Sequence, residues 1–243
     1  MRSGIAAVTD RVMDEPLVSV IIAIKDAERF LAQALDSVSA QTYRNYEIVV
    51  VDGASTDRGP SIAAAYPHTR CIPQGGTGLW QAWNAGIATS RGSLVTFLDS
   101  DDLWSSSKLA DQVSYLSRHP ATPCVIGRVK YFIEPGHAIP NGFKPALLND
   151  SHVAYMPGVA MLRRSLFQRL GTFEEHWRIA SDIVWFAKLR ECGVPIGCID
   201  DILLHKRVHS ANLGYVTSAS VYRQELTHFL KETLDRRRAA PKS

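Results

Sequence analysis

The sequence predicts an α/β fold with a mostly parallel central sheet and helices on both faces. Three mainly apolar runs are typical of strands covered on both faces: 17–24 and 46–52, which are rich in Val and Ile, and 93–98. Segments with helical spacing separate these runs, and this alternation is typical of a doubly wound sheet. Carboxylates follow the same strands, where such sheets bind their ligands: Asp26, Asp52 and the acidic run 99–102.

The first half of the chain alternates strands and helices. After the first apolar run, side chains from Phe30 to Val38 recur at helical spacing, which predicts a helix within 27–41. The remaining elements follow in this order: the strand at 46–52, a helix at 61–66, a short strand at 70–73, a glycine-rich loop and helix within 75–92, and the strand at 93–98.

The second half is more mixed and predicts a smaller mixed sheet. Gly171 and Gly193 follow two helical patterns, as expected where helices end. The expected elements are a helix at 106–119, strands within 122–134, a loop at 134–151, a strand and short helix within 159–173, a helix at 179–193, and strands at 195–200 and 202–209.

These elements predict one domain with additions at each end. We expect the domain at 17–215, with halves at 17–104 and 105–215. Residues 1–16 are predicted to form a flexible arm. Residues 216–243 are predicted to form a C-terminal amphipathic helix with a basic tail.

The composition excludes several classes of protein. The 243 residues carry a net charge of +3 and 21% charged residues, too mild a basic excess to indicate nucleic acid as a partner. No apolar stretch reaches the length of a membrane span, and the N-terminus lacks the apolar core of a secretory signal. The four cysteines form no CxxC pair, which argues against structural zinc. We therefore expect a cytoplasmic protein.

The segment FLDSDDLW places Asp99, Asp101 and Asp102 within four positions, directly after an apolar strand. Carboxylates so close together repel one another and need a cation. Oxygen ligands suit Mg²⁺ or Mn²⁺, and Mg²⁺ is commonly held by one or two carboxylates together with substrate phosphates. The alternative, a turn or a cap for the next helix, has about equal weight on spacing alone.

Asp52 ends the second buried strand, in VVVDGASTD. A carboxylate accepts hydrogen bonds and so suits the N–H of a base or a ribose hydroxyl. Ser55, Thr56 and Asp57 resemble the cap of the next helix, so a loop that only turns the chain is the stronger interpretation from this segment alone.

Four segments in order resemble the family 2 glycosyltransferases and their Rossmann-like GT-A fold. They are VSVIIAIKDAERFLAQALDSVSAQTYRNYEIVVVDGASTD, GLWQAWNAGIATSRGSLVTFLDSDD, GTFEEHWRIASDIVWFAKLRECG and RVHSAN. The resemblance covers roughly residues 16–215, and ordered matches over such a length are far more specific than a single motif. It implies a nucleotide-sugar-binding first half and an acceptor-binding second half.

The resemblance implies roles for named residues. Asp182 falls at the position of the catalytic base, with a first-turn carboxylate favoured by the helix dipole as the alternative. Arg207 is expected at the diphosphate. The metal ligands implied are Asp101, Asp102 and His209, with a structural strand-end histidine as the alternative for His209. The nucleotide-sugar-binding residues implied are Ala23, Lys25, Asp26, Asp52, Trp80, Asn84, Asp99, Ser100 and Asp101.

The implied reaction is an inverting, metal-dependent transfer. The donor is a nucleoside-diphosphate sugar, with a UDP-sugar favoured by resemblance, and the cofactor is Mn²⁺ or Mg²⁺. Asp182 removes a proton from the acceptor hydroxyl, which attacks the anomeric carbon in a single displacement. The implied role lies in the synthesis of cell-surface polysaccharide, glycolipid or glycoconjugate.

The sequence does not identify the acceptor, which is a saccharide or a lipid-linked saccharide. Trp177, Trp185 and Tyr155 are the aromatic candidates for stacking on it. The basic C-terminal helix has two interpretations: docking onto the domain, which is favoured, or peripheral contact with the inner face of a membrane.

Two other classes of function remain as alternatives. A sugar-phosphate nucleotidyltransferase needs a glycine-rich phosphate loop after the first strand, where this chain has AIKDAERF. A catalytically inactive GT-A scaffold is disfavoured because Asp52, Asp99, Asp101 and Asp182 are all present. Turnover of a nucleotide sugar separates both alternatives from a transferase.

Overall fold

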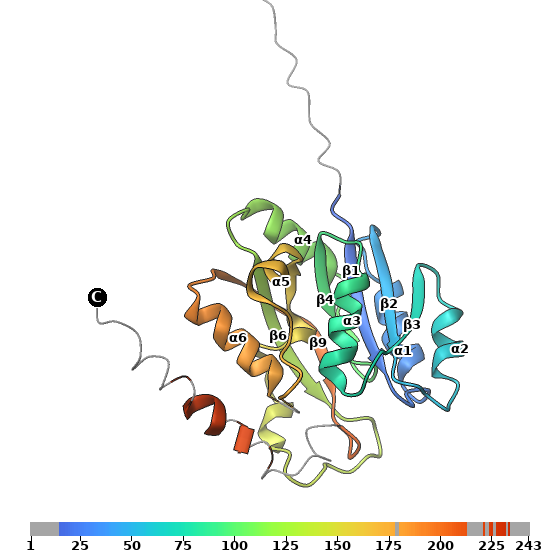
Figure 1. Cartoon of the computed structure of the whole chain (residues 1–243). Coiled ribbons are helices and arrows are strands. Elements are labelled where there is room, and N and C mark those ends of the chain that lie inside the picture. Colours follow the sequence, from blue (N-terminus) through green and yellow to red (C-terminus); the bar gives the residue numbers. More distant parts are fainter. Residues whose placement is uncertain are drawn as a thin grey trace, which may run out of the picture.

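The computed structural model has an α/β architecture (Figure 1), and it describes residues 15–177 and 180–212, with positions 221, 224, 225, 227–231 and 233 beyond them. Most of the predicted N-terminal arm and the basic C-terminal tail lie outside the described residues. At the start of the described chain, the carbonyl of Pro16 accepts a hydrogen bond from Tyr43 Oη at 2.7 Å.

Nine strands of the described chain form one sheet, in the order β3-β2-β1-β4-β8-β6-β9-β5, with β7 paired to β6. The strands are β1 (Val18–Ile24), β2 (Tyr46–Asp52), β3 (Thr69–Pro73), β4 (Leu94–Phe97), β5 (Leu103–Trp104), β6 (Cys124–Phe132), β7 (His152–Val153), β8 (Met161–Arg163) and β9 (Ile196–Arg207).

The strand directions bring distant parts of the chain to one edge. β1 is parallel to β2 and β4, β2 to β3, and β6 to β9. Since β8 is antiparallel to both β4 and β6, strands β6 and β9 run in the same direction as β1. The predicted α/β class is confirmed. The sheet as a whole is mixed, because β5 is also antiparallel to β9 and β7 to β6, and the strands expected as a smaller mixed sheet extend the parallel part formed by β1 to β4 through β8.

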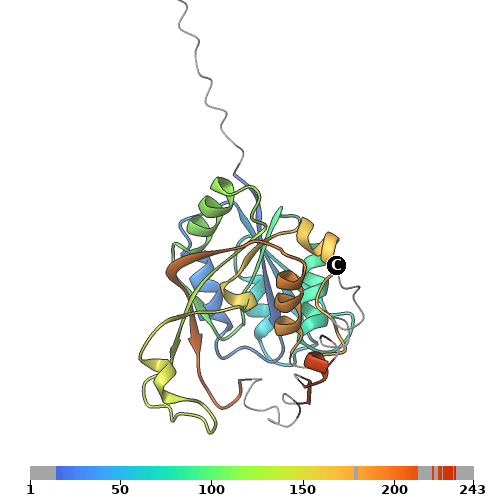
Figure 2. The same ribbon diagram turned by 90° about the vertical axis from the view of Figure 1, so that its left-hand side faces the viewer.

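Helices cover both faces of the sheet, as the sequence predicts. In Figures 1 and 2, α3, α5 and α6 lie on one face, and α1 and α4 lie on the other. The helices are α1 (Leu31–Ser39), α2 (Gly59–Ala64), α3 (Leu79–Thr89), α4 (Lys108–Arg118), α5 (Ser165–Leu170) and α6 (Ser181–Glu191), with 3-10 turns η1 (Pro145–Leu148) and η2 (Pro157–Val159).

The sheet is stable because its central strands are apolar on both faces. Each residue of β1 and β2 is buried apart from the half-buried Ala23 and Asp52 near their carboxyl ends. Glu47 is an exception, because it is charged and yet buried. Its carboxylate accepts hydrogen bonds from Ser19 Oγ at 2.7 Å and from the backbone N–H of Arg91 at 2.6 Å. The polar groups at the strand ends therefore lie beside a rigid core.

The last strand differs in detail from the prediction. We expected two strands at 195–200 and 202–209, whereas β9 is one continuous strand with irregular pairing to β6 near Arg128. A β-bulge places extra residues in one strand without ending it, so the irregular apolar pattern there resembles a break.

The described part of the predicted C-terminal helix packs on the domain. Phe229 lies in a small apolar cluster with Trp177, Ala180 and Val184 at the beginning of α6. This contact agrees with the docking interpretation for that part of the chain. None of the helices in the described residues combines the length and the apolar character needed to span a bilayer.

Candidate active site

The candidate site lies at the edge where β1, β2, β4 and β9 end. The loops that leave these strands carry most of the residues singled out from the sequence, at 25–30, 53–58, 99–102 and 208–212. β1 ends beside β2 in register at Ile24 and Asp52, and β4 follows on the other side of β1. The topology thus gathers polar groups from both halves of the chain at one edge.

The acidic run after β4 forms a compact cluster. One carboxylate oxygen from each of Asp99, Asp101 and Asp102 lies within 4.8 Å of the others, which is close enough to hold a metal ion. A cation from the chain also reaches this cluster: Lys206 Nζ lies 3.0 Å from Asp99 Oδ2 and 2.8 Å from Asp102 Oδ2. Lys206 belongs to β9, more than one hundred residues away in sequence.

Asp102 is buried and fully engaged, with 1% of its surface exposed. Its Oδ1 accepts the backbone N–H of Arg207 at 2.8 Å, and its Oδ2 accepts Lys206 Nζ. Burial raises the pKa of Asp102, and the Lys206 ammonium opposes this rise. Burial also opposes the charge on Lys206, but the surrounding carboxylates offset it and raise the pKa of Lys206. We expected Asp102 as a metal ligand; here both of its oxygens bind groups of β9.

Asp101 makes different contacts from its two neighbours. Its Oδ2 lies 2.9 Å from His209 Nε2 and 3.0 Å from Asn212 Nδ2. The side chains of Asp101 and His209 are 22% and 13% exposed, so both reach the surface of the site. The structure therefore brings together Asp101 and His209, two of the three expected metal ligands, as one accessible pair.

Arg207 is buried next to the loop that carries Asp101. Its side chain is buried between the rings of Phe30 and Phe132, 4.4 and 4.8 Å from their centroids. Its guanidinium donates to the carbonyl of Asp101 at 2.7 Å and to Gln33 Oε1, and it forms an ion pair with Glu134. This residue was expected at the diphosphate, and its contacts to a donor remain a prediction.

Asp182 occupies the first turn of α6, and its Oδ1 accepts the backbone N–H of Ile183 at 2.8 Å. Burial raises the pKa of Asp182 to about 6; the charge of Asp99 adds to the rise and Lys206 opposes it. The charges of the acidic cluster and of Lys206 therefore influence the candidate base. A carboxylate with a pKa near neutrality is suited to proton transfer.

Three cavities adjoin at this edge. The β1–β3 cavity of about 360 Å³ is lined by Ala23, Ile24, Lys25, Gly53, Gln74, Gly76, Thr77, Gly78, Leu79 and Ala82. The Asp99 cavity of about 290 Å³ is lined by Ala23, Leu79, Asp99, Ser100, Asp101, Lys206 and Asn212. The His209 cavity of about 400 Å³ is lined by Lys25, Asp26, Ala27, Arg29, Phe30, Ser100, Asp101, His209 and Ala211. They share lining residues and are therefore neighbours, and each is large enough for part of a small-molecule ligand.

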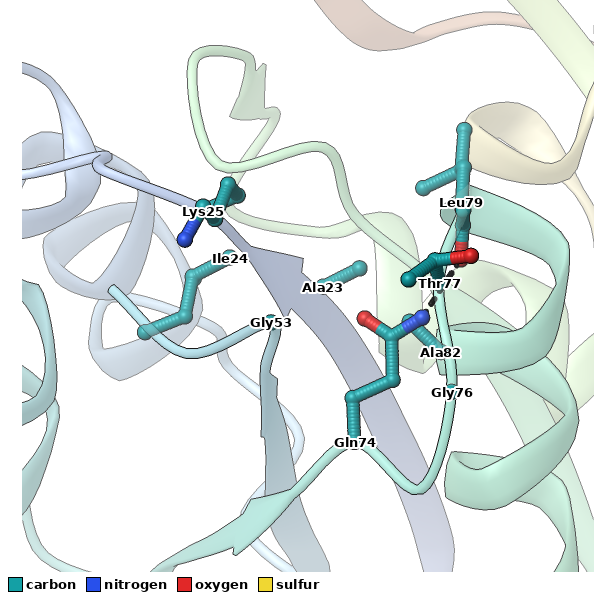
Figure 3. Close-up of a pocket in the computed structure, with 10 residues that line it drawn as sticks. Ala23, Ile24, Lys25, Gly53, Gln74, Gly76, Thr77, Leu79 and Ala82 are labelled. Atoms are coloured by element: carbon teal, nitrogen blue, oxygen red, sulfur yellow. Dashed lines mark hydrogen bonds between the residues drawn. The ribbon is translucent and has the colours of Figure 1, made fainter.

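Figure 3 shows the β1–β3 cavity, with Lys25 on one side of the end of β1 and Gln74, Thr77 and Leu79 on the other. The Gln74 side chain donates from Nε2 to the carbonyl of Gly78 at 2.8 Å. The same residue pairs through its backbone N–H with the carbonyl of Asp52. The end of β2 is therefore joined to the glycine-rich loop.

The loops after β1 and β2 are fixed to each other. Asp26 Oδ1 accepts the backbone N–H of Thr56 at 2.8 Å, which lowers the pKa of Asp26, and the Asp26 N–H donates to Ser55 Oγ. Asp52 Oδ1 accepts the N–H of Ser55 at 3.0 Å, and Lys25 binds the carbonyl of Ala54. The Asp52 side chain thus closes the turn that follows β2.

Trp80 and Asn84 lie on the helix side of the site. Trp80 is 5% exposed and packs against Trp83 and Phe173, with ring centroids 5.2 and 5.8 Å away. Asn84 exchanges hydrogen bonds with the backbone of Phe173 and also donates to Glu175. Both residues hold the 173–175 segment to α3, so their expected contact with the donor remains a prediction.

Sequence reasoning did not single out Lys206, Asn212 or Gln74. The signal for Lys206 was available, because a basic residue near the end of a strand in HKRVH was as well placed as the neighbouring Arg207 and His209. Asn212 and Gln74 have ordinary surroundings in the sequence, and only the folded loops bring them to the cavities.

This fold and this site define a class of protein: an α/β protein with a cluster of acidic residues and ligand-sized cavities at the edge where β1, β2 and β4 end. The sequence profile described as glycosyl transferase family 2 matches residues 19–171, which is more than half of the chain. The chain belongs to glycosyl transferase family 2, and the resemblance inferred from the sequence is confirmed.

Relatives agree with this assignment. The chain is 29% identical over 211 residues to an uncharacterized glycosyltransferase of Rickettsia typhi, covering 81% of this chain and 65% of that protein. It is 34% identical over 105 residues to the putative glycosyltransferase EpsH of Bacillus subtilis, covering 42% of this chain and 30% of EpsH. The chain thus spans slightly less than two thirds of its Rickettsia typhi relative.

Solved structures share the fold. TarS 1–349 of S. aureus in complex with UDP-GlcNAc superposes with a TM-score of 0.66 at 20% identity, covering 83% of this chain and 61% of TarS. The same TarS segment in complex with UDP gives a TM-score of 0.63 at 21% identity, covering 79% and 61%. At this identity the likeness supports the predicted GT-A fold.

Proposed function

We propose that this chain transfers a sugar from a nucleoside-diphosphate sugar, with a UDP-sugar favoured, to a hydroxyl acceptor with inversion at the anomeric carbon. The observation that carries the proposal is the acidic cluster of Asp99, Asp101 and Asp102, two of which line a ligand-sized cavity. The chain belongs to family 2, and Asp182, whose pKa burial raises to about 6, is the candidate base.

The donor is assigned to the adjoining cavities. We assign the nucleoside to the β1–β3 cavity, which is lined by Ala23, Lys25 and Gly53, the residue that follows Asp52. The diphosphate and sugar are assigned to the Asp99 cavity, lined by Ser100 and Asp101. Support comes from TarS, which has this fold and was solved with UDP and with UDP-GlcNAc.

Asp101 and His209 are the residues that would hold a divalent cation. Their donor set is a carboxylate oxygen and an imidazole nitrogen, which suits Mn²⁺ or Mg²⁺ completed by phosphate oxygens. The two side chains lie 2.9 Å apart and line the same cavity, which fits such an ion. When bound, the cation would offset the negative charge that develops on the leaving diphosphate.

Asp182 is proposed as the general base. Its carboxylate would accept the proton of the acceptor hydroxyl as that oxygen attacks the anomeric carbon. Because the proposal is a single displacement, no carboxylate needs to form a covalent glycosyl intermediate, in contrast to retaining glycosidases. The Lys206 ammonium near Asp182 favours the ionised form of the base.

The acceptor is assigned to the α6 side of the site. Among the three aromatic candidates, Trp177 and Trp185 are each 2% exposed, whereas Tyr155 is 50% exposed. Tyr155 packs edge-on against Phe186, which lies one helical turn beyond Asp182. Tyr155 is therefore the proposed platform for a saccharide ring, with polysaccharide, glycolipid or glycoconjugate synthesis as the proposed context.

The experiment is a thermal-shift panel followed by a turnover assay. Nucleoside diphosphates and nucleotide sugars are added with and without Mn²⁺, and a ligand that binds the native state raises the Tm by mass action. We expect a rise with a uridine nucleotide that depends on metal in the wild type and is lost in Asp101→Ala. Asp111→Ala, a first-turn carboxylate of α4, is the matched control.

The turnover assay separates the alternatives. Release of nucleoside diphosphate together with a glycosylated acceptor supports transfer, whereas formation of a nucleotide sugar from nucleoside triphosphate indicates a nucleotidyltransferase. Nucleotide binding without turnover by any sugar donor indicates the inactive scaffold. A chain that binds no nucleotide, with or without metal, contradicts the proposed donor.

A further inference from the structure

We propose that Glu225 of the C-terminal helix is a positioning residue for the transfer, because it holds the start of α6 and thereby fixes the place of Asp182. This inference rests on the proposed role of Asp182 as the base and deepens it. The described residues of the C-terminal helix are 221, 224, 225, 227–231 and 233. Within this helix, Glu225 Oε2 accepts the backbone N–H of Ala180 at 2.9 Å, two residues before Asp182.

The sequence of α6 lacks a cap of its own at this point. Its N-cap residue is Ala180, whose side chain has no hydrogen-bond acceptor. In a capping box, a Glu or Gln at the third helical position accepts the N–H of the N-cap residue, but here that position holds Ile183. The hydroxyl of Ser181 donates to the carbonyl of Glu174 at 2.9 Å instead. Glu225 therefore supplies the missing acceptor, and a carboxylate at a helix N-terminus is also favoured by the helix dipole.

Apolar contacts hold the C-terminal helix against the same part of the chain. Phe229 lies four residues after Glu225, so the two side chains share one face of their helix. Phe229 is 8% exposed and belongs to one apolar cluster with Trp177, Ala180 and Val184. The ring centroids of Phe229 and Trp177 are 6.3 Å apart. The C-terminal helix thus packs against residues that precede and follow the beginning of α6.

The first turn of α6 depends on this contact more than the rest of the helix does. Further along α6, Trp185 and Leu189 lie in the main core. The buried residues two positions before and two positions after Asp182 lie instead in the separate cluster of Phe229. Catalysis is sensitive to such placement, since a displacement of about 1 Å can cost about 100-fold in rate. Loss of the C-terminal contact should therefore displace the base while the main core remains intact.

The first experiment measures hydrogen–deuterium exchange at the start of α6 in the full chain, without substrate. Glu225→Ala removes the acceptor, so we expect the Ala180 amide to exchange about tenfold faster, the size expected for the loss of a helix cap. Glu225→Gln retains an oxygen acceptor and should exchange as the wild type does. Gln224→Ala, at the exposed neighbouring position, is the matched control.

The second experiment measures kcat and the donor KM. Glu225→Ala should lower kcat about tenfold and leave the donor KM within about twofold of the wild type, because the cavities assigned to the donor are lined by other elements. Glu225→Gln should restore kcat. Phe229→Ala releases the same helix through a different contact and should act alike in both experiments, whereas Leu230→Ala, at a residue that is 58% exposed, should not. This pair also tests the proposal if Glu225→Ala does not fold.

Three results would overturn the proposal. Unchanged exchange at the start of α6 in the folded variants would show that the C-terminal helix does not hold this turn. A rise in donor KM as large as the fall in kcat would indicate a general loss of structure. Failure of Glu225→Gln to restore kcat would mean that the charge of Glu225 acts, and not its hydrogen bond to Ala180. Absence of turnover in the wild type would refute the proposed function, while the exchange experiment would still decide whether Glu225 holds α6.

Discussion

The sharpest prediction concerns Asp182 and the pH dependence of transfer. Two perturbations are combined: the pH is lowered from 8 to 5, and Asp182 is replaced in Asp182→Asn. The substitution keeps the size of the side chain and its place in the first turn of α6, but it removes the group that accepts a proton. Both perturbations therefore act on the same step.

The magnitude follows from the surroundings of Asp182. Burial, with help from the charge of Asp99, raises the pKa of Asp182 from 3.8 to about 6. A base works only when it is deprotonated, so activity is lost as the pH falls through this value. At a pKa of 6 the ionised fraction is about 90% at pH 7 and about 10% at pH 5, so kcat should fall about tenfold across this interval.

The assay is kcat at saturating donor and metal, measured from pH 5 to 8 in the wild type. Asp182→Asn should lose about 10²–10⁴-fold in kcat, the usual contribution of a general base, and its residual rate should lack the step near pH 6. Its affinity for the nucleoside diphosphate should remain within about twofold of the wild type, because the base is assigned to the acceptor side.

Asp111→Asn is the control, since Asp111 is also a first-turn carboxylate of an eleven-residue helix. It tests whether a helix-dipole effect alone lowers activity. The reasoning is refuted if Asp182→Asn keeps most of its kcat, or if the wild-type profile first falls near pH 4, as an unperturbed carboxylate would require.

Three further predictions concern the packing around the site. Although burial raises it, hydrogen bonds from Arg91 and Ser19 hold the pKa of Glu47 at about 2, below its usual 4.5, so roughly 3 kcal/mol of stability is present above pH 4.5 and lost as the pH falls toward 2. Urea unfolding at pH 5 and 3 should show this loss in the wild type and not in Glu47→Gln; equal pH dependence would contradict it. Burial lowers the pKa of Lys108 well below 10.5, so the unfolded chain binds the extra proton, and the stability of the wild type relative to Lys108→Met should rise between pH 7 and 10. A constant difference would mean that Lys108 is charged in the folded state. Tyr155→Ala should raise the KM for the acceptor several-fold with the donor KM unchanged, and Tyr155→Phe should restore it; a matching rise in donor KM would place Tyr155 elsewhere in the reaction.

The fold was predictable because its strongest signals are local. The runs at 17–24 and 46–52 are mainly apolar, and only a strand covered on both faces buries nearly every residue of such a run. The same sequence order placed the acidic residues at one sheet edge, because parallel strands of a doubly wound sheet end together. Family membership, shown by the profile match, rests on the same ordered segments.

The contacts within the site were not predictable in the same way. Asp102 and Lys206 are separated by 104 residues, and no local pattern indicates which cation meets which carboxylate. The exposure of the aromatic candidates could not be predicted from the sequence either. Trp177, Trp185 and Tyr155 are equivalent candidates in the sequence, and only the folded structure shows that two of them are buried. Such outcomes depend on tertiary contacts, which local periodicity does not encode.

The end of β9 indicates how one strand organises the whole site. Successive side chains of a strand point to opposite faces, and Lys206 and Arg207 accordingly serve different partners, the acidic cluster and the buried ring pocket of Phe30. The face of the sheet that each of these two side chains occupies depends on the irregular β6–β9 register that precedes them. From Cys198 to Leu204, β9 advances six residues while its partner positions in β6, from 126 to 129, advance three. This excess of three is odd, so it reverses which face each later residue occupies, and a one-residue change there would exchange the faces of the lysine and the arginine. The bulge therefore contributes to the site, because it determines whether the lysine or the arginine of β9 faces the carboxylates.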